Sequence, residues 1–337
     1  MNGRERTLAF LQGRPADHVP FHPLVMQYAA ELTGVNYRDF CTDYRRQSEA
    51  MVGFARQYGL DWLHPAGWPY CEAIAYGLRV SFPENGLPLA EERLIRDPET
   101  DLDRIRPLDI ESSAMMMNRV ECVRYNKETV RDEFFLAAHC EGPLAEYTDL
   151  RGVEDGLMDL IMYPDEVADA MRVIVDNAKR WILLQVQAGA DCVSIGDAVC
   201  SQISESMYEE FILPLHRELV DYVRSLGAYS KFHICGNITH LIPRLIELGI
   251  DMIDVDHMVE LKPEYYAAMR PGQCFSGNID PVSQLRFGTP ESIRAAVSAV
   301  MKNSSGKLIL ASGCEVPKGT PVENYKAFYE AACRCSG

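Results

Sequence analysis

Three side chains that can bind a metal, His233, Cys235 and Cys314, each stand where an apolar run of the sequence ends. His233 and Cys235 form a His-x-Cys pair at the end of 229–235, and Cys314 follows the apolar run 308–312. Zinc binds neutral imidazole and thiolate, and catalytic zinc sites use three protein ligands and leave one position open. These residue types at these positions therefore predict a catalytic zinc site.

Composition limits the class of protein. The chain has 337 residues, of which 47% are hydrophobic and 24% charged, enough to bury the core of one large domain. It has neither a long apolar stretch nor a signal-like N-terminus, and its eleven scattered cysteines are typical of a reduced protein. We therefore expect a cytoplasmic protein that does not cross a membrane. The formal net charge of −16 argues against a surface that binds nucleic acid or anionic lipid.

Short apolar runs alternate with longer segments of helical periodicity. This alternation predicts an α/β fold, a (β/α)8 TIM barrel that forms a single domain over 1–337. Within it we expect an N-terminal helical lead-in at 1–18 and an inserted excursion, rich in proline and charge, at 81–110 after the second strand. The eight predicted strands are 19–24, 60–64, 134–139, 191–196, 230–235, 252–256, 274–278 and 308–312.

Polar side chains stand at or just after the ends of most of these predicted strands. In barrel enzymes the catalytic groups come from the C-terminal ends of several strands, so a ring of polar residues at those ends supports the barrel prediction. The ring consists of His64, His139, Asp197, His233, Cys235, Asp256, His257, Asn278, Asp280, Cys314 and Glu315.

Four motifs resemble the uroporphyrinogen decarboxylase superfamily. Residues 232–237 read Phe-His-Ile-Cys-Gly-Asn, 277–281 read Gly-Asn-Ile-Asp-Pro, and 312–317 read Ser-Gly-Cys-Glu-Val-Pro. The fourth is Gly-Ala-Asp at 189–191 with Asp197. The His-x-Cys and Gly-Cys-Glu pair is similar to the zinc-dependent cobamide methyltransferase branch, where the histidine and both cysteines bind zinc. The resemblance covers nearly the whole chain, and it implies a corrinoid-dependent methyltransferase that uses the three ligands given above.

The decarboxylase itself is an alternative that the sequence disfavours. Uroporphyrinogen decarboxylases carry an Arg-Gln-Ala-Gly-Arg element after the first strand, whose arginines bind the carboxylates of the substrate. Here the corresponding residues 25–31 read Val-Met-Gln-Tyr-Ala-Ala-Glu, without an arginine. Such a site would bind an anionic tetrapyrrole poorly.

Several other residues are candidates for the active site. Asp256 ends the strand after the one that carries His233, and is either a fourth zinc ligand or a hydrogen-bond partner behind the ligands. Glu72 resembles a glutamate that follows the second strand in the methyltransferases. It either contacts the substrate, carries a proton, or is an ordinary acid in the first turn of a helix. Aromatic residues after that strand either line a substrate pocket or pack in the core. The candidates are Glu72, Asp197 and Asp256 for catalysis, and Trp62, Trp68, Tyr70, His139, Asn237 and Asn278 for substrate binding.

We expect the protein to move a methyl group between a small substrate and the cobalt of a corrinoid, with zinc activating the substrate heteroatom. The stretches 26–43 and 62–72 look closer to bacterial members of the branch, which favours demethylation of a methoxylated aromatic. A methylcobamide:thiol methyltransferase of the coenzyme M type is the main alternative, and a non-catalytic scaffold with structural zinc is another. Because the chain lacks an Asp-x-His-x-x-Gly cobalt-binding element, we expect the corrinoid on a separate partner protein.

Overall fold

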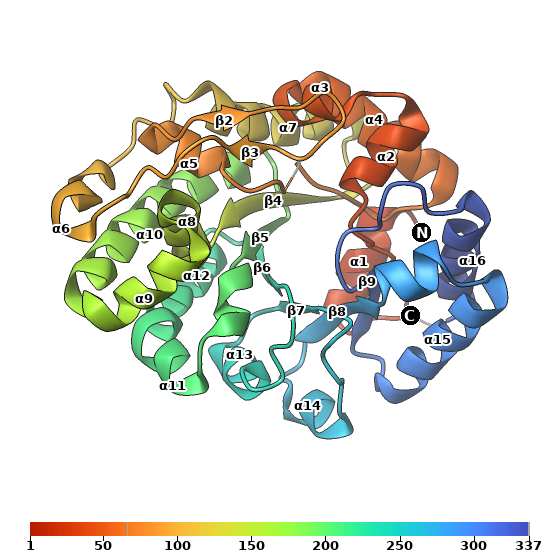
Figure 1. Ribbon diagram of the computed structural model, residues 1–337. Helices are drawn as coiled ribbons and strands as arrows, with labels where there is room; N and C mark the ends of the chain where they lie inside the picture. The colour runs from red at the N-terminus through yellow and green to blue at the C-terminus, as the bar shows by residue number, and fades with distance from the viewer. Residues whose placement is uncertain (66, 336–337) are drawn as a thin grey trace.

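The computed structural model describes residues 1–65 and 67–335. Its centre is a parallel sheet of seven strands that curls into a barrel, and helices surround this sheet (Figure 1). The strands neighbour one another in chain order, as in a (β/α)8 barrel, so the predicted α/β TIM-barrel fold is confirmed. In that order they are β1 (Trp62–Leu63), β4 (Phe135–Glu141), β5 (Cys192–Gly196), β6 (Tyr229–Ile234), β7 (Met252–Val255), β8 (Cys274–Ile279) and β9 (Leu308–Ser312).

The first predicted strand, 19–24, closes the barrel with a single bridge instead of a full strand. Phe21 pairs in parallel with Leu310 of β9, and its carbonyl accepts a hydrogen bond from the Asp61 N–H at 3.0 Å on the other side. Prolines flank this bridge in the sequence. Because proline has no N–H to donate, a longer ladder cannot form here.

Helix boundaries follow capping signals in the sequence. The helix α10 (Pro164–Gln187) begins with proline and two acids in its first turn. At α15 (Pro290–Asn303) the Thr289 hydroxyl accepts a hydrogen bond from the Ser292 N–H at 3.2 Å. The other helices are α1 (Gly3–Leu11), α2 (Met26–Thr33), α3 (Tyr37–Thr42), α4 (Tyr44–Tyr58), α5 (Cys71–Tyr76), α6 (Pro98–Asp101), α7 (Ala114–Val130), α8 (Pro143–Arg151), α9 (Val153–Met162), α11 (Glu205–Met207), α12 (Leu213–Ser225), α13 (Ile242–Leu248), α14 (Pro263–Ala268) and α16 (Val322–Cys333), with short turns η1 (Leu102–Arg104), η2 (Ala198–Gln202), η3 (Tyr208–Ile212) and η4 (Pro281–Arg286).

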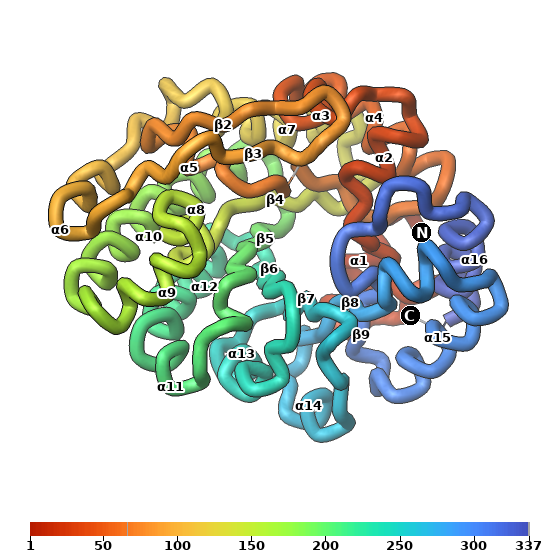
Figure 2. The backbone as a smooth tube through the Cα atoms, viewed as in Figure 1, coloured from red at the N-terminus to blue at the C-terminus, as the bar shows by residue number. Residues whose placement is uncertain are grey.

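The two ends of the described chain lie on the same side of the barrel, beside α16 (Figure 2). The Val19 N–H donates to the Cys335 carbonyl at 3.1 Å, so the segment that enters the barrel is held by the segment that leaves it. The described residues include no helix long and apolar enough to cross a membrane.

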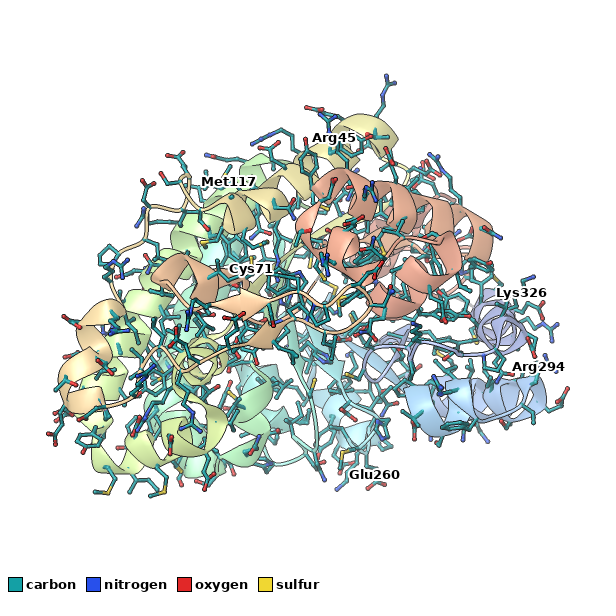
Figure 3. The ribbon with its side chains drawn as sticks, turned by 45° about the horizontal axis from the view of Figure 1, so that its top comes forward. Arg45, Cys71, Met117, Glu260, Arg294 and Lys326 are labelled. Carbon is teal, nitrogen blue, oxygen red and sulfur yellow. The ribbon has the colours of Figure 1, made fainter. Side chains whose placement is uncertain are left out.

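The segment predicted as an excursion, 81–110, packs on the outer helices. It completes a hairpin of β2 (Val80–Ser81) and β3 (Leu89–Ala90), and then forms α6 and η1. The Asn177 side chain on α10 accepts a hydrogen bond from the Leu108 N–H at 2.9 Å, which ties the end of the segment to the helix layer. In the same region α5 and α7 lie side by side, marked by the labels on Cys71 and Met117 in Figure 3.

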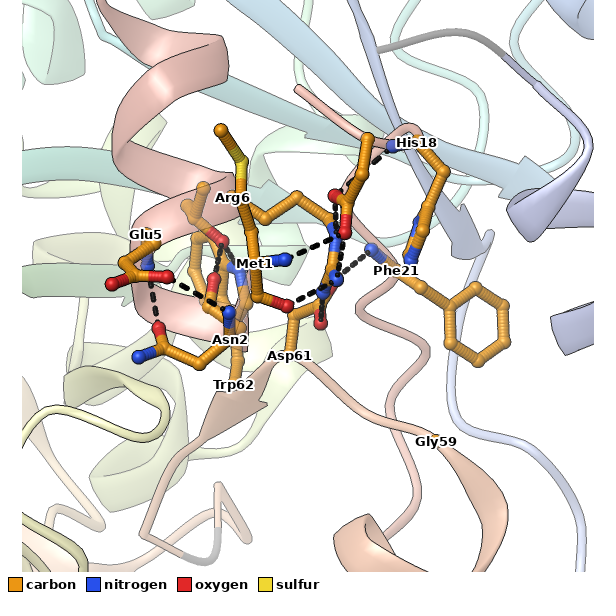
Figure 4. Close-up of polar contacts among 12 residues, drawn as sticks. Met1, Asn2, Glu5, Arg6, His18, Phe21, Gly59, Asp61 and Trp62 are labelled. Carbon is orange, nitrogen blue, oxygen red and sulfur yellow. Dashed lines mark hydrogen bonds and ion pairs between the residues drawn. The ribbon is translucent and has the colours of Figure 1, made fainter.

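The N-terminal helix α1 closes the end of the barrel at which the strands begin, where its Leu11 packs with Trp62 and Phe135. Figure 4 shows the polar contacts that hold this helix in place. The buried Arg6 side chain pairs with Asp17, with Nε and Oδ1 2.7 Å apart, and with Asp61, whose other oxygen accepts from the Phe21 N–H at 2.8 Å. Apolar residues fill the barrel behind this network, so the opposite ends of the strands are free to carry polar groups. The filling residues are Leu11, Trp62, Phe135, Ala137, Cys192, Met252, Cys274 and Ile309.

Candidate metal centre and active site

The three predicted ligands come together at the C-terminal ends of β6 and β9. His233 Nε2 lies 3.0 Å from Cys235 Sγ, and Cys235 Sγ lies 3.8 Å from Cys314 Sγ. A tetrahedral zinc ion with zinc–sulfur bonds of about 2.3 Å holds two sulfurs about 3.8 Å apart. The hydrogen bond with Cys235 and the nearby His233 imidazole lower the pKa of Cys314 to about 4, despite its burial. The donor set and its spacing therefore fit zinc.

Strand geometry explains why these side chains converge. Residues two apart on a strand share one face, so β6 directs both Lys231 and His233 into the barrel. The end of β9 reaches the group because Gly313 has no side chain: a Cβ at this position would lie 2.3 Å from the His257 nitrogen. Any other residue would clash with this backbone atom, so glycine is required for the close approach of the β9 end to the segment after β7.

Asp254, inside β7, holds the histidine ligand and was not predicted from the sequence. His233 Nδ1–H donates to Asp254 Oδ2 at 2.8 Å, and Lys231 Nζ lies 3.0 Å from the same oxygen. Although burial opposes ionisation, Lys231 and the hydrogen bond from His233 keep the pKa of Asp254 below its usual value. The carboxylate thereby fixes the imidazole with Nε2 facing the cysteines, as carboxylates behind metal-bound histidines do. An acid within an otherwise apolar strand was the signal that could have revealed it.

Asp256, the candidate for a fourth ligand, supports the turn that follows Cys235. Its carboxylate accepts hydrogen bonds from the Gly236 N–H at 2.9 Å and the Met258 N–H at 3.1 Å. The potential ligand atoms that lie together in this part of the described chain belong to His233, Cys235 and Cys314. Of the two predicted alternatives, the geometry favours the hydrogen-bonding role.

A cavity of about 70 Å³ opens beside His233. Three further histidines line it: His22 from the closing segment, His64 after β1 and His139 from β4. Burial lowers the pKa of His64 to about 4 and that of His139 to about 3, so both are neutral at neutral pH. His139 was predicted as a substrate-binding residue, whereas the part played by His22 was not foreseen. The other lining residues are Leu24, Met26, Pro65, Gly67, Ala137, Ala138, Ser194 and Lys231.

The predicted aromatic residues lie behind this cavity and not on its wall. Trp62 is fully buried, donates from Nε1 to the Thr7 hydroxyl at 3.0 Å and stacks under His22 at a ring separation of 4.2 Å. Trp68 is also buried, and the Tyr70 N–H donates to Asp149 at 3.2 Å. Core packing, the alternative to a pocket wall, is thus the arrangement that the structure gives for Trp62.

Four other candidates are occupied by local contacts. Glu72 is buried and accepts a hydrogen bond from the Glu141 N–H at 2.8 Å. Asp197, predicted as a catalytic residue, is fully buried; its carboxylate lies 2.8 Å from His216 Nε2 and accepts from the Ala145 N–H in the first turn of α8. Asn237 caps its own turn and the Asn278 amide donates to the Val259 carbonyl at 2.9 Å; neither side chain lines the cavity.

A closed parallel barrel with histidine and two cysteines at its strand ends defines the class: a TIM barrel with a candidate catalytic metal centre. The chain belongs to the uroporphyrinogen decarboxylase (URO-D) family, whose model matches residues 2–334. The recognition made from the motifs is therefore confirmed.

Relatives within this family include corrinoid enzymes. The chain is 27% identical over 234 residues to methylcobamide:CoM methyltransferase MtbA of Methanosarcina mazei, covering 69% of this chain and 67% of that protein. It is 23% identical to MtaA of Methanosarcina barkeri, covering 97% and 96% of the two chains. A uroporphyrinogen decarboxylase of Prochlorococcus marinus is 31% identical, over 46% of this chain and 44% of its own length.

A solved methyltransferase from Methanosarcina mazei has the same fold, with a TM-score of 0.87, 19% identity and coverage of 98% of both chains. A putative vitamin-B12-independent methionine synthase from Listeria monocytogenes is more distant, with a TM-score of 0.55, 14% identity and coverage of 94% and 95%. The prediction of an enzyme of the corrinoid-dependent methyltransferase class is confirmed at the level of the family.

Proposed function

We propose that this protein transfers a methyl group between a corrinoid carried by a separate protein and a small substrate bound at zinc. The observation that carries the proposal is the His233–Cys235–Cys314 group, which offers three ligand atoms within 4.8 Å of one another beside a cavity. The relatives named as methylcobamide:CoM methyltransferases support the same chemistry. When bound, zinc would act as a Lewis acid that lowers the pKa of a thiol or polarises an ether oxygen.

The surrounding residues prepare the ligands for this role. Asp254 accepts a hydrogen bond from His233 Nδ1–H and so keeps Nε2 free for the metal. The positive charge of Lys231 balances the negative charge of this buried carboxylate. Asp256 holds the Gly236 N–H and fixes the turn that positions Cys235. Because these partners are already in place, the ligands need little rearrangement to bind an ion.

The size of the cavity favours a small thiol as the methyl acceptor. An apolar cavity that binds benzene has a volume of about 150 Å³, whereas the cavity beside His233 has about 70 Å³. The names of the relatives point to coenzyme M, which is itself a thiol. We therefore place methylation of a small thiol first.

Demethylation of a methoxylated aromatic, favoured from the sequence, is the second candidate. The ligand atoms of the His233–Cys235–Cys314 group include two thiolates and no carboxylate. A site without a carboxylate leaves more Lewis acidity to polarise an ether oxygen. For this substrate the ring would have to lie at the mouth of the cavity, with the ether oxygen toward the metal.

The remaining alternatives have less support. Residues 25–31 contain no arginine pair that could bind the carboxylates of uroporphyrinogen, and Met26 of this segment lines the cavity instead. A non-catalytic zinc scaffold would need a closed set of four protein ligands, whereas the described group at the ends of β6 and β9 offers three: His233, Cys235 and Cys314. X-ray absorption with and without an added thiol separates a closed zinc shell from an open one.

The activity test follows methylcobalamin by absorbance. With a small thiol such as coenzyme M, the purified zinc enzyme is expected to consume methylcobalamin, whereas Cys314→Ser is expected to be inactive. Cys333→Ser is the matched control, because this cysteine is exposed on α16. In parallel, cob(I)alamin and a panel of methoxyphenols test the second candidate. Formation of methylcobalamin from the phenols without consumption by thiols would reverse the order of the two substrates.

A further inference from the structure

A group of four carboxyl groups and one arginine lies behind the cavity; Glu72 and Glu146 are buried, whereas Glu141 and Asp149 are partly buried. Glu72 comes from α5, Glu141 from the end of β4, and Glu146 and Asp149 from α8. Arg119 on α7, which lies beside α5 (Figure 3), contributes the guanidinium. Glu146 is 1%, Arg119 2% and Glu72 6% exposed. This carboxyl cluster therefore combines four acidic side chains with a single basic one in a region that is largely shielded from water.

Several polar atoms in the carboxyl cluster have no hydrogen-bond partner among the described residues. They include both carboxyl oxygens of Glu146, Oε2 of Glu72, and Nε and Nη1 of Arg119. Arg119 Nη1 lies 3.8 Å from Glu72 Oε2, and the guanidinium packs over the rings of Trp68 and Trp181 at 5.1 and 5.6 Å. A buried carboxylate without partners is unfavourable, so such groups bind protons instead of remaining charged.

The electrostatics agree with protonated carboxyl groups. Burial, followed by the neighbouring acids, raises the pKa of Glu146 well above its usual value and does the same for Asp149. Burial raises the pKa of Glu141 to about 7, even though Arg119 opposes the shift. One member of the cluster thus exchanges its proton near neutral pH while others keep theirs.

Glu141 connects the carboxyl cluster with the cavity. Its Oε1 lies 3.2 Å from His139 Nε2, within hydrogen-bond distance, and its N–H donates to Glu72 Oε1 at 2.8 Å. His139 lines the cavity together with His233. Gly196 leaves room for the pair, since a Cβ there would lie 3.2 Å from His139 Cε1 and 3.4 Å from Glu141 Oε2. His139 and Glu141 therefore connect the candidate substrate site with the other acids of the carboxyl cluster.

We propose that His139 and Glu141 carry the proton that the substrate exchanges during methyl transfer, with the carboxyl cluster behind them as a proton store. This inference rests on the proposed function. When a thiol is methylated, its S–H bond breaks and an S–C bond forms, while the electron pair of the broken cobalt–carbon bond stays with the corrinoid. His139 stays neutral in this step: it accepts the released proton at Nδ1 while its Nε2 proton passes along the hydrogen bond to Oε1 of ionised Glu141. In ether demethylation the same residues return one proton to the departing oxygen.

The charged and titratable groups that face Glu141 come from every neighbouring element. Asp197 raises its pKa further, whereas Arg119 and His233 lower it. The carboxyl groups of Glu72, Glu146 and Asp149 share the same buried region, and their own pKa values respond to Glu141 in turn. Protonation of one member is therefore expected to shift the pKa values of the others, so the titration of Glu141 depends on the protonation of its neighbours.

The first test needs no enzymatic activity. Infrared difference spectra of the intact zinc protein, titrated through neutral pH, are expected to contain the carbonyl stretch of protonated carboxylic acids. Glu146→Gln is expected to remove a band that persists at neutral pH, and Glu141→Gln the band that titrates there. The matched control is Glu128→Gln, an exposed acid on α7. Spectra without any protonated carboxyl group at neutral pH would overturn the proposal.

The second test asks whether this proton is used in catalysis. Glu141→Gln is expected to slow methyl transfer to coenzyme M about 100-fold, the range of general acid–base effects, and to remove a limb of the pH–rate profile. Its zinc content and its KM for methylcobalamin should stay at the wild-type values. A Glu141→Gln enzyme with the wild-type rate and pH profile would contradict the relay. A failure of the proposed function gives a third result, in which wild type and variants are equally inactive while the infrared bands of protonated carboxyl groups remain. The carboxyl cluster would then hold protons without taking part in methyl transfer.

Discussion

Two groups of polar side chains meet at the C-terminal end of this barrel, and they differ in how fully they are partnered. The ligand group consists of His233, Cys235 and Cys314. One imidazole nitrogen of His233 contacts Asp254 and the other contacts Cys235, and Asp254 also pairs with Lys231. In the carboxyl cluster, Glu146 has no partner on either oxygen among the described residues. The first group is arranged to hold charge, whereas the buried Glu146 of the second has no partner for a negative charge and is expected to bind a proton instead.

This difference in hydrogen bonding suits the two groups to different tasks, metal binding and proton transfer, which the active site must combine. A metal centre needs ligands fixed in one protonation state and one orientation, which complete hydrogen bonding provides. A proton carrier needs a group whose two protonation states are close in free energy, which incomplete partnering and burial provide. His139 lies between the two groups, because it lines the cavity with His233 and contacts Glu141.

The largest expected effect comes from removing a ligand. Cys314→Ser should lose most of the bound zinc and with it methyl transfer, because the remaining His233 and Cys235 leave the ion with too few strong ligands. The barrel should stay folded, since Cys314 lies in a loop after β9 and not in the core. Metal analysis and circular dichroism measure the two properties. Zinc retained by Cys314→Ser at the level of the Cys333→Ser control would contradict the ligand assignment.

Removing the carboxylate that orients a zinc ligand should lower zinc affinity less than removing the ligand itself. Asp254→Asn keeps the size of the side chain but loses the charge that pairs with Lys231 and orients His233. We expect zinc affinity to fall about 10–100-fold, the usual cost of losing a carboxylate behind a metal-bound histidine. Competition with a chromophoric chelator measures it. An unchanged affinity would mean that the ligand group does not depend on its partners, and the comparison with the carboxyl cluster would lose its basis.

The barrel and the ligand group could be predicted from the sequence because both leave local signals. Alternating apolar runs and helical segments indicate the fold, and His-x-Cys at the end of a run indicates the metal centre. The closing segment at Phe21 was predicted as a full strand, but flanking prolines limit it to one bridge. The proline signal was present in the sequence, and it was outweighed by the apolar pattern.

The carboxyl cluster could not be predicted because its members leave no common signal. Glu72, Arg119 and Glu146 stand on three different helices, and each resembles an ordinary charged residue of a surface helix. Only the packing of α5, α7 and α8 around the end of β4 buries them together. Glu72 alone was singled out, through its resemblance to a methyltransferase motif. Burial of a charge is a property of the tertiary structure, and periodicity along one helix does not contain it.

The pH dependence of stability tests whether Glu141 binds a proton in the folded protein. Burial raises the pKa of Glu141 from 4.5 to about 7, so its contribution to stability is complete below pH 4.5 and is lost as the pH rises toward 7. In Glu141→Gln this loss should be absent, and the free energy of unfolding should fall less than in wild type between these values. Urea denaturation at a series of pH values measures it, with Glu128→Gln as the control. Parallel curves for wild type and Glu141→Gln would show that this carboxyl group ionises freely in the fold.

The smallest effect is expected at Asp256, which lies next to the ligand group without belonging to it. Asp256→Asn retains one acceptor oxygen, so one of the hydrogen bonds from Gly236 and Met258 can persist while the other is lost. Loss of one such bond should cost about 1 kcal/mol of stability and leave the zinc content near one ion per chain. Methyl transfer should slow far less than in Cys314→Ser, because the turn after Cys235 is loosened but the three ligand atoms remain. If Asp256→Asn instead released zinc as Cys314→Ser does, the carboxylate would be a fourth ligand, and the boundary drawn here between ligands and supporting residues would move to include it.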